Sequence, residues 1–319
     1  MDKKRLRIFI LLFVIFVVSI IVSAFSGASQ LKLDTVVGKD ILWKIRIPRI
    51  VLGLLVGGAL ACCGAVFQGL LRNPLAEPYT LGISGAAALG VTLGVTSGAS
   101  GIYLPVFAFA GSAFSVFLVY SVAAKKRFSN PSLILGGVIL SFLFSSLVFL
   151  IFSISKAEDI HGVMLWLMGD LSSASDYLIR IIPFFILPGL GLLFVFSSEL
   201  NILTLGEEKA RHLGVNAEQV KKILFITASF ITGACVAASG IIGFVGLIIP
   251  HFMRRIVGVD HRALLPVSCI AGAGFLVLCD SIARTIIRPL ELPVGVITGI
   301  FGGVFFLSFL LKSKQWEIF

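Results

Sequence analysis

Residues 48–71 read PRIVLGLLVGGALACCGAVFQGLL, and the only charged side chain in this stretch is that of Arg49. An α-helix of about 20 apolar residues crosses the hydrocarbon core of a bilayer, so the stretch is long enough to span a membrane. Its glycines allow neighbouring helices to approach closely, and Asn73-Pro74 marks a turn after it. The stretch therefore predicts a membrane-spanning helix that is packed among others.

The whole chain of 319 residues has the same character. It is 58% hydrophobic and 13% charged, with a mean hydropathy of +1.07, whereas a soluble globular domain carries about 25% charged residues. Lipid is the expected solvent for most of its length, and no segment between the apolar stretches is long enough to form a soluble domain. We therefore expect residues 1–319 to form a single all-α transmembrane domain.

Ten stretches are candidate membrane spans. They cover residues 8–26, 48–71, 79–97, 104–124, 131–153, 177–198, 220–239, 241–257, 264–283 and 293–311. The boundary between the seventh and eighth stretches, at Ser239-Gly240, is the least clearly marked of these. The first stretch, after Lys3-Lys4-Arg5, also resembles a secretory signal, but it lacks a clean A-x-A cleavage site and many spans follow, which favours an uncleaved helix.

The distribution of cations orients these spans. With the N-terminus inside, 17 of the 26 lysines and arginines fall on the inner side, as the positive-inside rule requires for cytoplasmic loops. An even number of spans also places the C-terminus inside. We predict a multi-pass protein of a cell membrane with both termini in the cytoplasm. The same loops account for the net charge of +10, so no nucleic-acid partner is expected.

Two parts of the chain resemble each other weakly. Residues 57–74 match residues 233–250 at an offset of 176, with Gly64 on Gly240. Internal repeats of this kind are common in transporters, although glycine-rich helices also match by chance. Because the two stretches start on opposite sides of the predicted membrane, the repeat would be inverted.

Several chemistries have no motif in the sequence. There is no G-x-x-x-x-G-K-[ST] phosphate loop, no H-E-x-x-H and no G-x-S-x-G, and the five cysteines lie within apolar runs without a C-x-x-C pair. These absences give no support to ATP bound by a phosphate loop on this chain, to a metal site or to an intramembrane metalloenzyme. No acid lies clearly at a midplane, which disfavours an ion-coupled secondary transporter without excluding it.

One predicted inner loop has the features of a short helix. Residues 203–214 read LTLGEEKARHLG, in which Gly206 can open a helix and Gly214 can close it. Glu207-Glu208 would lie at its positive end and Arg211-His212 at its negative end, as the helix dipole favours.

A helix of two turns is too short to be stable alone in water. We therefore expect it to be held by packing through Leu205, Ala210 and Leu213. It is either a surface helix packed on its own protein or a docking helix for a cytoplasmic partner, and the residues alone leave both open.

Several segments together resemble the FecCD family, the permeases of ABC importers for iron chelates, haem and vitamin B12. Their order and spacing match over nearly the whole chain. The segments are 46–49 (RIPR), 64–78 (GAVFQGLLRNPLAEP), 205–214 (LGEEKARHLG), 243–251 (GFVGLIIPH), 260–266 (DHRALLP) and 291–295 (ELPVG).

The resemblance implies a complete importer around this chain. Family members have ten membrane helices and form permease dimers, homo- or heteromeric, with two cytoplasmic ATPase subunits that bind ATP and Mg²⁺. An extracytoplasmic binding protein delivers the ligand. This chain would be a transport subunit of the bacterial cytoplasmic (inner) membrane that is not an enzyme and carries no cofactor. The expected cargo is an iron(III)-siderophore, with haem or cobalamin as alternatives.

The resemblance also implies three sets of site residues. The ATPase coupling loop comprises Leu205, Gly206, Glu207, Glu208, Ala210, Arg211, Leu213 and Gly214. The binding protein would dock on Arg46, Arg49 and Arg284, whose planar guanidinium groups suit carboxylates; interfacial snorkelling is the alternative for the first two. A cytoplasmic gate would use Asn73, Leu75, Asn130 and Pro131, where Pro131 replaces the small hydroxylated residue expected in the family.

Overall fold

The computed structural model describes residues 3–27, 35–126 and 128–312. Within these ranges the chain is helical and has no β-strand, with one isolated bridge between Ile287 and Leu290. The predicted all-α class is therefore confirmed. The elements are α1 (Lys3–Phe25), α2 (Val36–Asp40), the π-helix η1 (Ile41–Arg46), α3 (Ile47–Leu71), the 3₁₀ turn η2 (Pro78–Leu81), α4 (Ile83–Thr96), α5 (Tyr103–Lys125), α6 (Asn130–Phe152), α7 (Ala157–Leu167), α8 (Asp176–Val195), α9 (Ser197–Thr204), α10 (Glu207–His212), α11 (Ala217–Ser239), α12 (Val245–Val257), α13 (His261–Ala283) and α14 (Val294–Lys312).

Each of the ten predicted spans coincides with one of these helices, but the helices differ in length. Among the described residues, six helices are long and apolar enough to cross a membrane, and α1, α4 and α14 contain shorter apolar segments. α12 has only 13 residues and carries Arg254 and Arg255 in its last turn. A multi-pass membrane protein follows, while the count of ten crossings stays a prediction.

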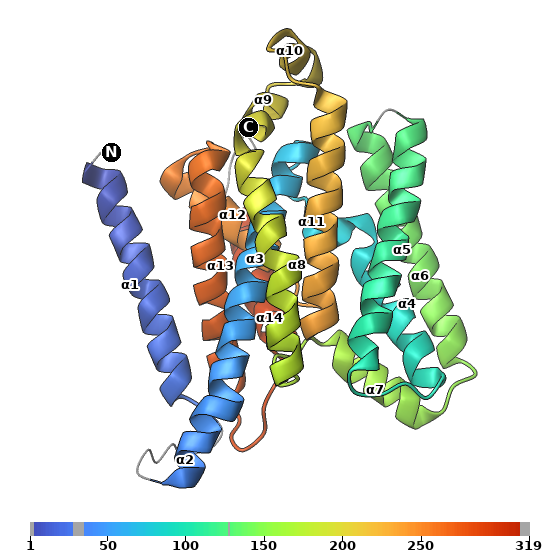
Figure 1. The fold of residues 1–319 in the computed structure, drawn as a ribbon, viewed down its shortest axis with the longest axis vertical. Coiled ribbons are helices and arrows are strands. Elements are labelled where there is room, and N and C mark those ends of the chain that lie inside the picture. Colours follow the sequence, from blue (N-terminus) through green and yellow to red (C-terminus); the bar gives the residue numbers. More distant parts are fainter. Residues whose placement is uncertain (1–2, 28–34, 127, 313–319) are drawn as a thin grey trace.

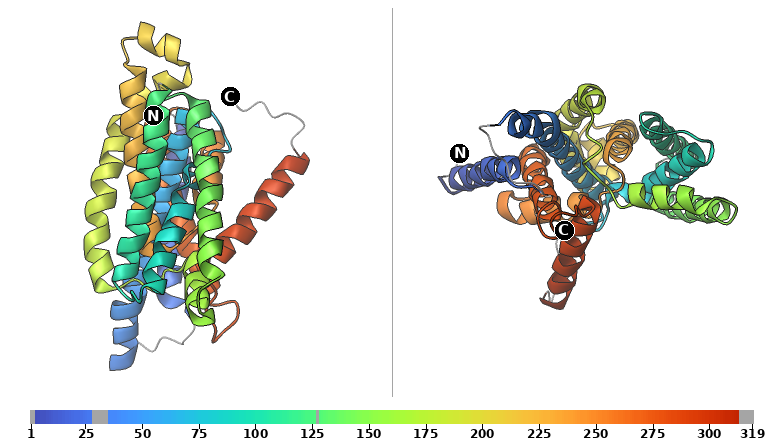
Figure 2. Two further views of the ribbon diagram at one scale, coloured as in Figure 1. Left: turned by 90° about the vertical axis from the view of Figure 1, so that its right-hand side faces the viewer. Right: turned by 90° about the horizontal axis from the view of Figure 1, so that it is seen from below.

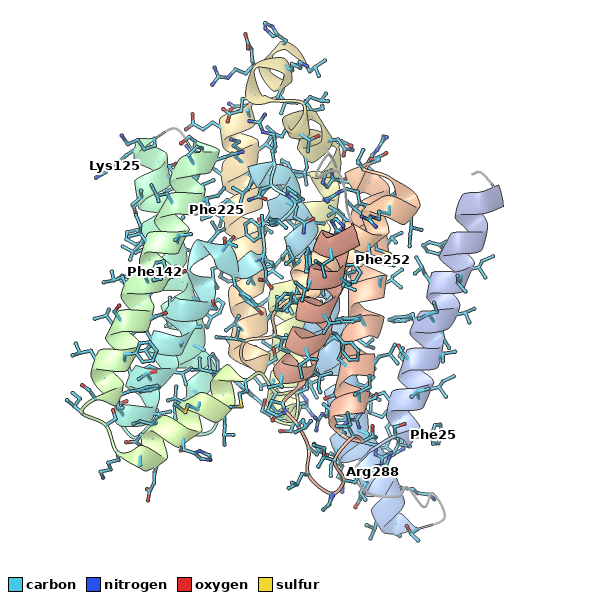
Figure 3. The ribbon with its side chains drawn as sticks, turned by 180° about the vertical axis from the view of Figure 1, so that it is seen from behind. Phe25, Lys125, Phe142, Phe225, Phe252 and Arg288 are labelled. Atoms are coloured by element: carbon cyan, nitrogen blue, oxygen red, sulfur yellow. The ribbon has the colours of Figure 1, made fainter. Side chains whose placement is uncertain are left out.

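The loops gather at two opposite ends of the bundle. Figure 1 shows the start of α1, the α5–α6 turn and α10 at one end, which we call the inner end, and α2 and α7 at the other, the outer end. Figure 3 shows Lys125 at the inner end and Arg288 at the outer end. The described cation-rich segments thus share one end, as predicted. The placement of that end in the cytoplasm stays a prediction, and Lys32, Arg127 and Lys314 lie outside the described residues.

α3 forms the centre of the bundle. The apolar part of the α2–α3 helix is 83% buried, whereas that of α6 is 17% buried. α13, α12, α11 and α8 all pack against α3. Glycines make these approaches close: a Cβ on Gly57 would meet the Gly272 carbonyl of α13, and one on Gly64 would meet the Gly246 carbonyl of α12. Small residues set the helix spacing, as expected in lipid.

α4, α5 and α6 form a second group beside this centre (Figure 2). A Cβ on Gly111 of α5 would meet the Ala86 carbonyl of α4, and one on Gly137 of α6 would meet the Thr80 carbonyl of η2. α14 instead leans away from the bundle (Figure 2) and exposes large apolar side chains such as Ile300 and Val304.

The order of helix lengths repeats. α3, α4, α5 and α6 have 25, 14, 23 and 23 residues, and α11, α12, α13 and α14 have 23, 13, 23 and 19. Figures 1 and 2 show corresponding helices running in opposite directions, which supports an inverted repeat. The two glycines that match in sequence, Gly64 and Gly240, differ in local structure. α3 continues through Gly64, whereas α11 ends before Gly240.

We expect Gly64→Ala to destabilise the protein. The added methyl group would meet the backbone of α12, which cannot move away independently of α3. Overpacking of this kind costs about 1–3 kcal/mol and should lower the melting temperature of the purified protein in detergent. Gly191→Ala in α8 is the matched control, because nothing lies within 4 Å of its added carbon. Equal melting temperatures for the two variants would contradict the close-packing account.

Candidate functional site

The predicted short helix exists and protrudes at the inner end as α10 (Figure 1). Gly206 begins it with φ 113° and Gly214 follows it with φ 80°, values that favour glycine at both positions. Glu207 and Glu208 lie in its first turn, and Arg211 lies in its last turn. The helix therefore begins and ends where the sequence predicts.

Its apolar side chains do not all pack on the chain itself. Ala210 is buried and its carbonyl accepts a hydrogen bond from the Val215 amide, 2.9 Å away. Leu205 and Leu213 are 57% and 60% exposed. Of the three residues expected to hold the helix, only Ala210 is buried within this chain, and the two leucines present apolar surface at the tip of the inner end.

Polar contacts hold the base of this protrusion. Asn201 of α9 donates to Asp260 Oδ1 at 2.6 Å and accepts from the His261 amide at 2.8 Å, so α9 is tied to the start of α13. Hydrogen bonds from Arg262, and then from Asn201, hold the pKa of Asp260 well below its usual range. The negative charge of Asp260 therefore also stabilises the N-terminus of α13.

The first predicted gate segment is a turn after α3. The Asn73 side chain accepts a hydrogen bond from the Leu75 amide at 2.9 Å, which is the Asx turn that Asn-Pro favours, and Leu75 is exposed. Two polar residues in this part of the chain bind the start of α12 and the residue before it: Gln68 donates to the Gly246 carbonyl at 3.3 Å, and Glu77 accepts from the Phe244 amide at 2.6 Å.

The second predicted gate segment opens α6. Pro131 is exposed in the first turn, where a proline needs no backbone partner. The Asn130 side chain instead accepts a hydrogen bond from Lys221 of α11 at 2.8 Å. Sequence reasoning missed Gln68, Glu77 and Lys221. A polar or charged residue beside or within a predicted span was the signal that could have found them.

At the outer end, the predicted docking arginines are buried. Arg49 forms ion pairs with Asp280 at 2.8 Å and Glu291 at 2.5 Å and lies 3.8 Å from Asp170. Arg284 pairs with the other oxygen of Asp280 at 2.9 Å. Asp280 is only 2% exposed, whereas the Glu291 side chain is 38% exposed. One buried carboxylate thus holds two of the three arginines.

Two of these arginines also hold the end of α1. Arg284 donates to the Ser23 hydroxyl at 2.6 Å and to the Ser26 carbonyl at 3.2 Å, and Arg46 donates to the Ala24 carbonyl at 2.9 Å. Cations suit the last carbonyls of a helix, which lack partners within it. The structure thus gives all three arginines an intramolecular role that the sequence did not reveal, and docking through them stays a prediction.

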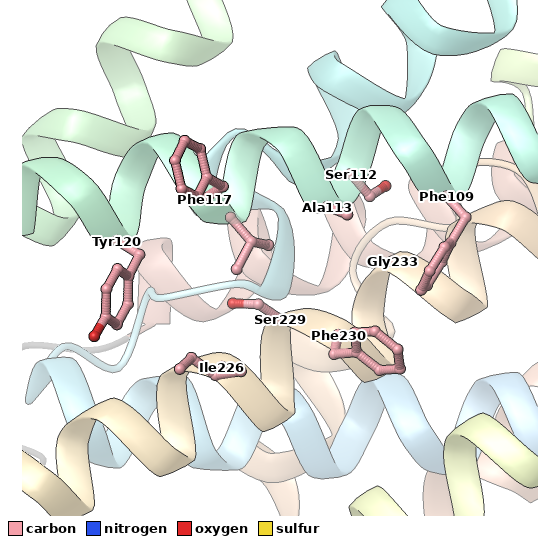
Figure 4. Close-up of a pocket in the computed structure, with 10 residues that line it drawn as sticks. Phe109, Ser112, Ala113, Phe117, Tyr120, Ile226, Ser229, Phe230 and Gly233 are labelled. Carbon is pink, nitrogen blue, oxygen red and sulfur yellow. The ribbon is translucent and has the colours of Figure 1, made fainter.

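An apolar groove lies between two helices of the bundle, and none of the predicted gate residues lines it. Figure 4 shows an apolar groove of about 260 Å³ between α5 and α11, lined by Phe109, Phe117 and Phe230 and by the hydroxyls of Ser112 and Ser229. In the described ranges, no three His, Cys, Asp or Glu side chains come together as a metal site would require.

Residues 4–312 match the FecCD transport family. The chain belongs to this family. It is 40% identical over 278 residues to the cobalamin import system permease protein BtuC of Halobacterium salinarum, covering 86% of this chain and 74% of that protein. It is 37% identical over 320 residues to the hemin transport system permease protein HmuU of Yersinia pestis, covering 95% of each.

A solved structure supports the same assignment for this FecCD protein. A chain from an inward-facing metal-chelate type ABC transporter superposes with a TM-score of 0.87 at 32% identity, covering 97% of this chain and all of that one. The FecCD chain is therefore a permease of an ABC importer. The relatives differ in the cargo named for them, so cargo is a separate question.

We expect Asp280→Asn to destabilise the FecCD permease strongly, because it leaves Arg49 and Arg284 buried without their shared negative charge. Breaking a buried ion pair from one side costs about 3–5 kcal/mol. The free energy of unfolding in mixed detergent micelles measures this. Glu291→Gln is the comparison variant. Because the Glu291 side chain is partly exposed, this substitution should lower the free energy of unfolding by less. Equal losses would show that Asp280 does not organise the outer end.

Proposed function

We propose that this ABC importer permease carries an iron(III)-siderophore across the bacterial cytoplasmic membrane, driven by two ATPase subunits that bind at the inner end. The observation that carries the proposal is α10, which protrudes at the cation-rich end and is flanked by the exposed Leu205 and Leu213. Solvent-exposed leucines at the two ends of a protruding helix are expected to be covered by a partner, since burying each stabilises a complex by about 1.5–3 kcal/mol.

The cargo proposal rests on chemistry shared by the relatives. Cobalamin and haemin are both metal ions held by an organic chelator, and iron chelates are the cargo that the family resemblance favours. Haem and cobalamin, carried by the same mechanism, remain the alternatives, because relatives named for them are about equally similar. The cargo would pass between this chain and a second permease subunit, for which the exposed apolar faces of α6 and α14 offer surface.

Transport would proceed by alternating access. ATP and Mg²⁺ bound by the ATPase subunits would draw these together and displace α10, shifting the permease between outward- and inward-open arrangements. ATP can drive this only if it binds the two arrangements with different affinity. Asn73, Leu75, Asn130 and Pro131 would close the inner side of the path.

At the outer end, a binding protein would deliver the chelate. Because Arg49 is covered by Glu291 and Asp170, we infer that carboxylates of the binding protein reach the arginines by replacing these two partly exposed side chains. Asp280 would stay in place and keep the cluster folded.

We expect Leu205→Ser combined with Leu213→Ser to weaken ATPase binding by about 10-fold or more, because two exposed apolar anchors are lost. Co-purification of the ATPase and ATP-dependent uptake by proteoliposomes measure this. Ile154→Ser, an 83% exposed residue at the outer end, is the matched control and should leave both unchanged. If the double variant retains both, α10 is not the ATPase contact. Uptake driven by an ion gradient without any ATPase would instead support a secondary transporter.

A further inference from the structure

Lys221 is a buried cation that connects three segments at the inner end. It lies near the start of α11 and is 3% exposed. Its ammonium group donates to Glu207 Oε1 of α10 at 2.5 Å, to Asn130 Oδ1 at the start of α6 at 2.8 Å, and to the Phe128 carbonyl in the α5–α6 turn at 3.3 Å. An ammonium group has three N–H donors, so all three are used.

We propose that Lys221 is the positioning residue through which α10 controls the gate segment that opens α6. This inference rests on the proposed function, because it takes α10 as the ATPase contact and Asn130 as part of the gate. It adds a specific physical connection between them. Asn130 and Lys221 are 91 residues apart in the chain, and Lys221 and Glu207 are 14 apart.

The charge of Lys221 makes the connection costly to break. A buried ammonium is expensive to leave without a counter-ion, and Glu207 is the carboxylate that pairs with it. Movement of α10 away from α11 must therefore either carry Lys221 along or separate a pair that is buried on one side. In the first case the hydrogen bond from Lys221 to Asn130 breaks, and in the second case the ammonium group loses its counter-ion and can redirect that bond.

The turn before α6 is fixed to α11 by a second, apolar contact. Phe128 is fully buried, and its ring lies 6.3 Å from that of Phe225 on α11 and 5.2 Å from that of Tyr120 on α5. The backbone of Phe128 has φ 51°, a conformation rare for residues other than glycine. The packing therefore holds the turn against α11, and the polar side chain of Asn130 is the part of the segment that responds to α10.

A mechanism follows from these contacts. While Glu207 holds the ammonium group, Lys221 binds Asn130 and keeps the first turn of α6 in the arrangement seen here. When an ATPase displaces α10, Lys221 loses or redirects its bond to Asn130, and that turn can rearrange. Coupling between sites of this kind is typically worth 5- to 150-fold in an equilibrium.

The test measures the ratio of chelate transported to ATP hydrolysed in proteoliposomes that contain the permease with its ATPase and binding protein. Lys221→Met keeps the length of the side chain and removes its charge and donors. We expect the ratio to fall by about 5-fold or more, with the ATPase still bound and ATP still hydrolysed. Lys125→Met, which removes an exposed cation from the same end, should keep the wild-type ratio.

Asn130→Ala tests the other half of the connection without disturbing a buried charge. It should lower the same ratio. The double variant with Lys221→Met should have a ratio no lower than that of either single variant, because both substitutions remove the same hydrogen bond between Lys221 and Asn130. If Lys221→Met fails to fold, Asn130→Ala alone decides the question. Wild-type ratios in folded variants would overturn the inference. Absence of ATP-dependent uptake in the unchanged protein would instead overturn the proposed function.

Discussion

Close backbone contact around α3 is the constraint on which the rest of this structure depends. Helices in lipid gain little from burying apolar surface, because the lipid is equally apolar, and they associate through tight packing and polar contacts. The glycine contacts of α3 with α12 and α13 provide that packing. They place the short helix α12 beside the end of α3, where Gln68 and Glu77 bind the start of α12 and its preceding residues. The inner loops are thus positioned by helix packing in the middle of the bundle.

Charge is then used differently at the two ends. At the outer end, Asp280 forms ion pairs with Arg49 and Arg284, and Arg284 also donates a hydrogen bond to a backbone carbonyl at the end of α1. These groups stabilise the fold and leave only Glu291 and Asp170 partly exposed. At the inner end, Lys221 is shared between α10 and the α5–α6 turn, so the charge links a protruding helix to the start of α6. The first arrangement joins elements within the buried outer end, whereas the second joins a protruding helix to the bundle.

Much of this organisation could be predicted from the sequence, because it depends on local properties. Apolar length indicated the helices, cations indicated which loops share an end, and Gly206 and Gly214 marked the bounds of α10. The features that could not be predicted depend on partners far apart in the chain. Arg49 and Asp280 are separated by 231 residues, so the sequence alone did not reveal that the arginines are buried. The same holds for Lys221 and Asn130, which are 91 residues apart. The offset of 176 residues between the two matching parts does not align their helices. α11 ends at Ser239, whereas α3 continues past the aligned position to Leu71.

We propose that this FecCD permease moves an iron(III)-siderophore inward, driven by ATP that its partners hydrolyse. Uptake can be measured in proteoliposomes that hold the permease with its ATPase and binding protein, offered a radiolabelled ferric siderophore, haemin or cobalamin in parallel. We expect the ferric siderophore to accumulate only when ATP and the ATPase are both present. Accumulation of haemin or cobalamin in place of the siderophore would contradict the cargo, and uptake without the ATPase would contradict the mechanism.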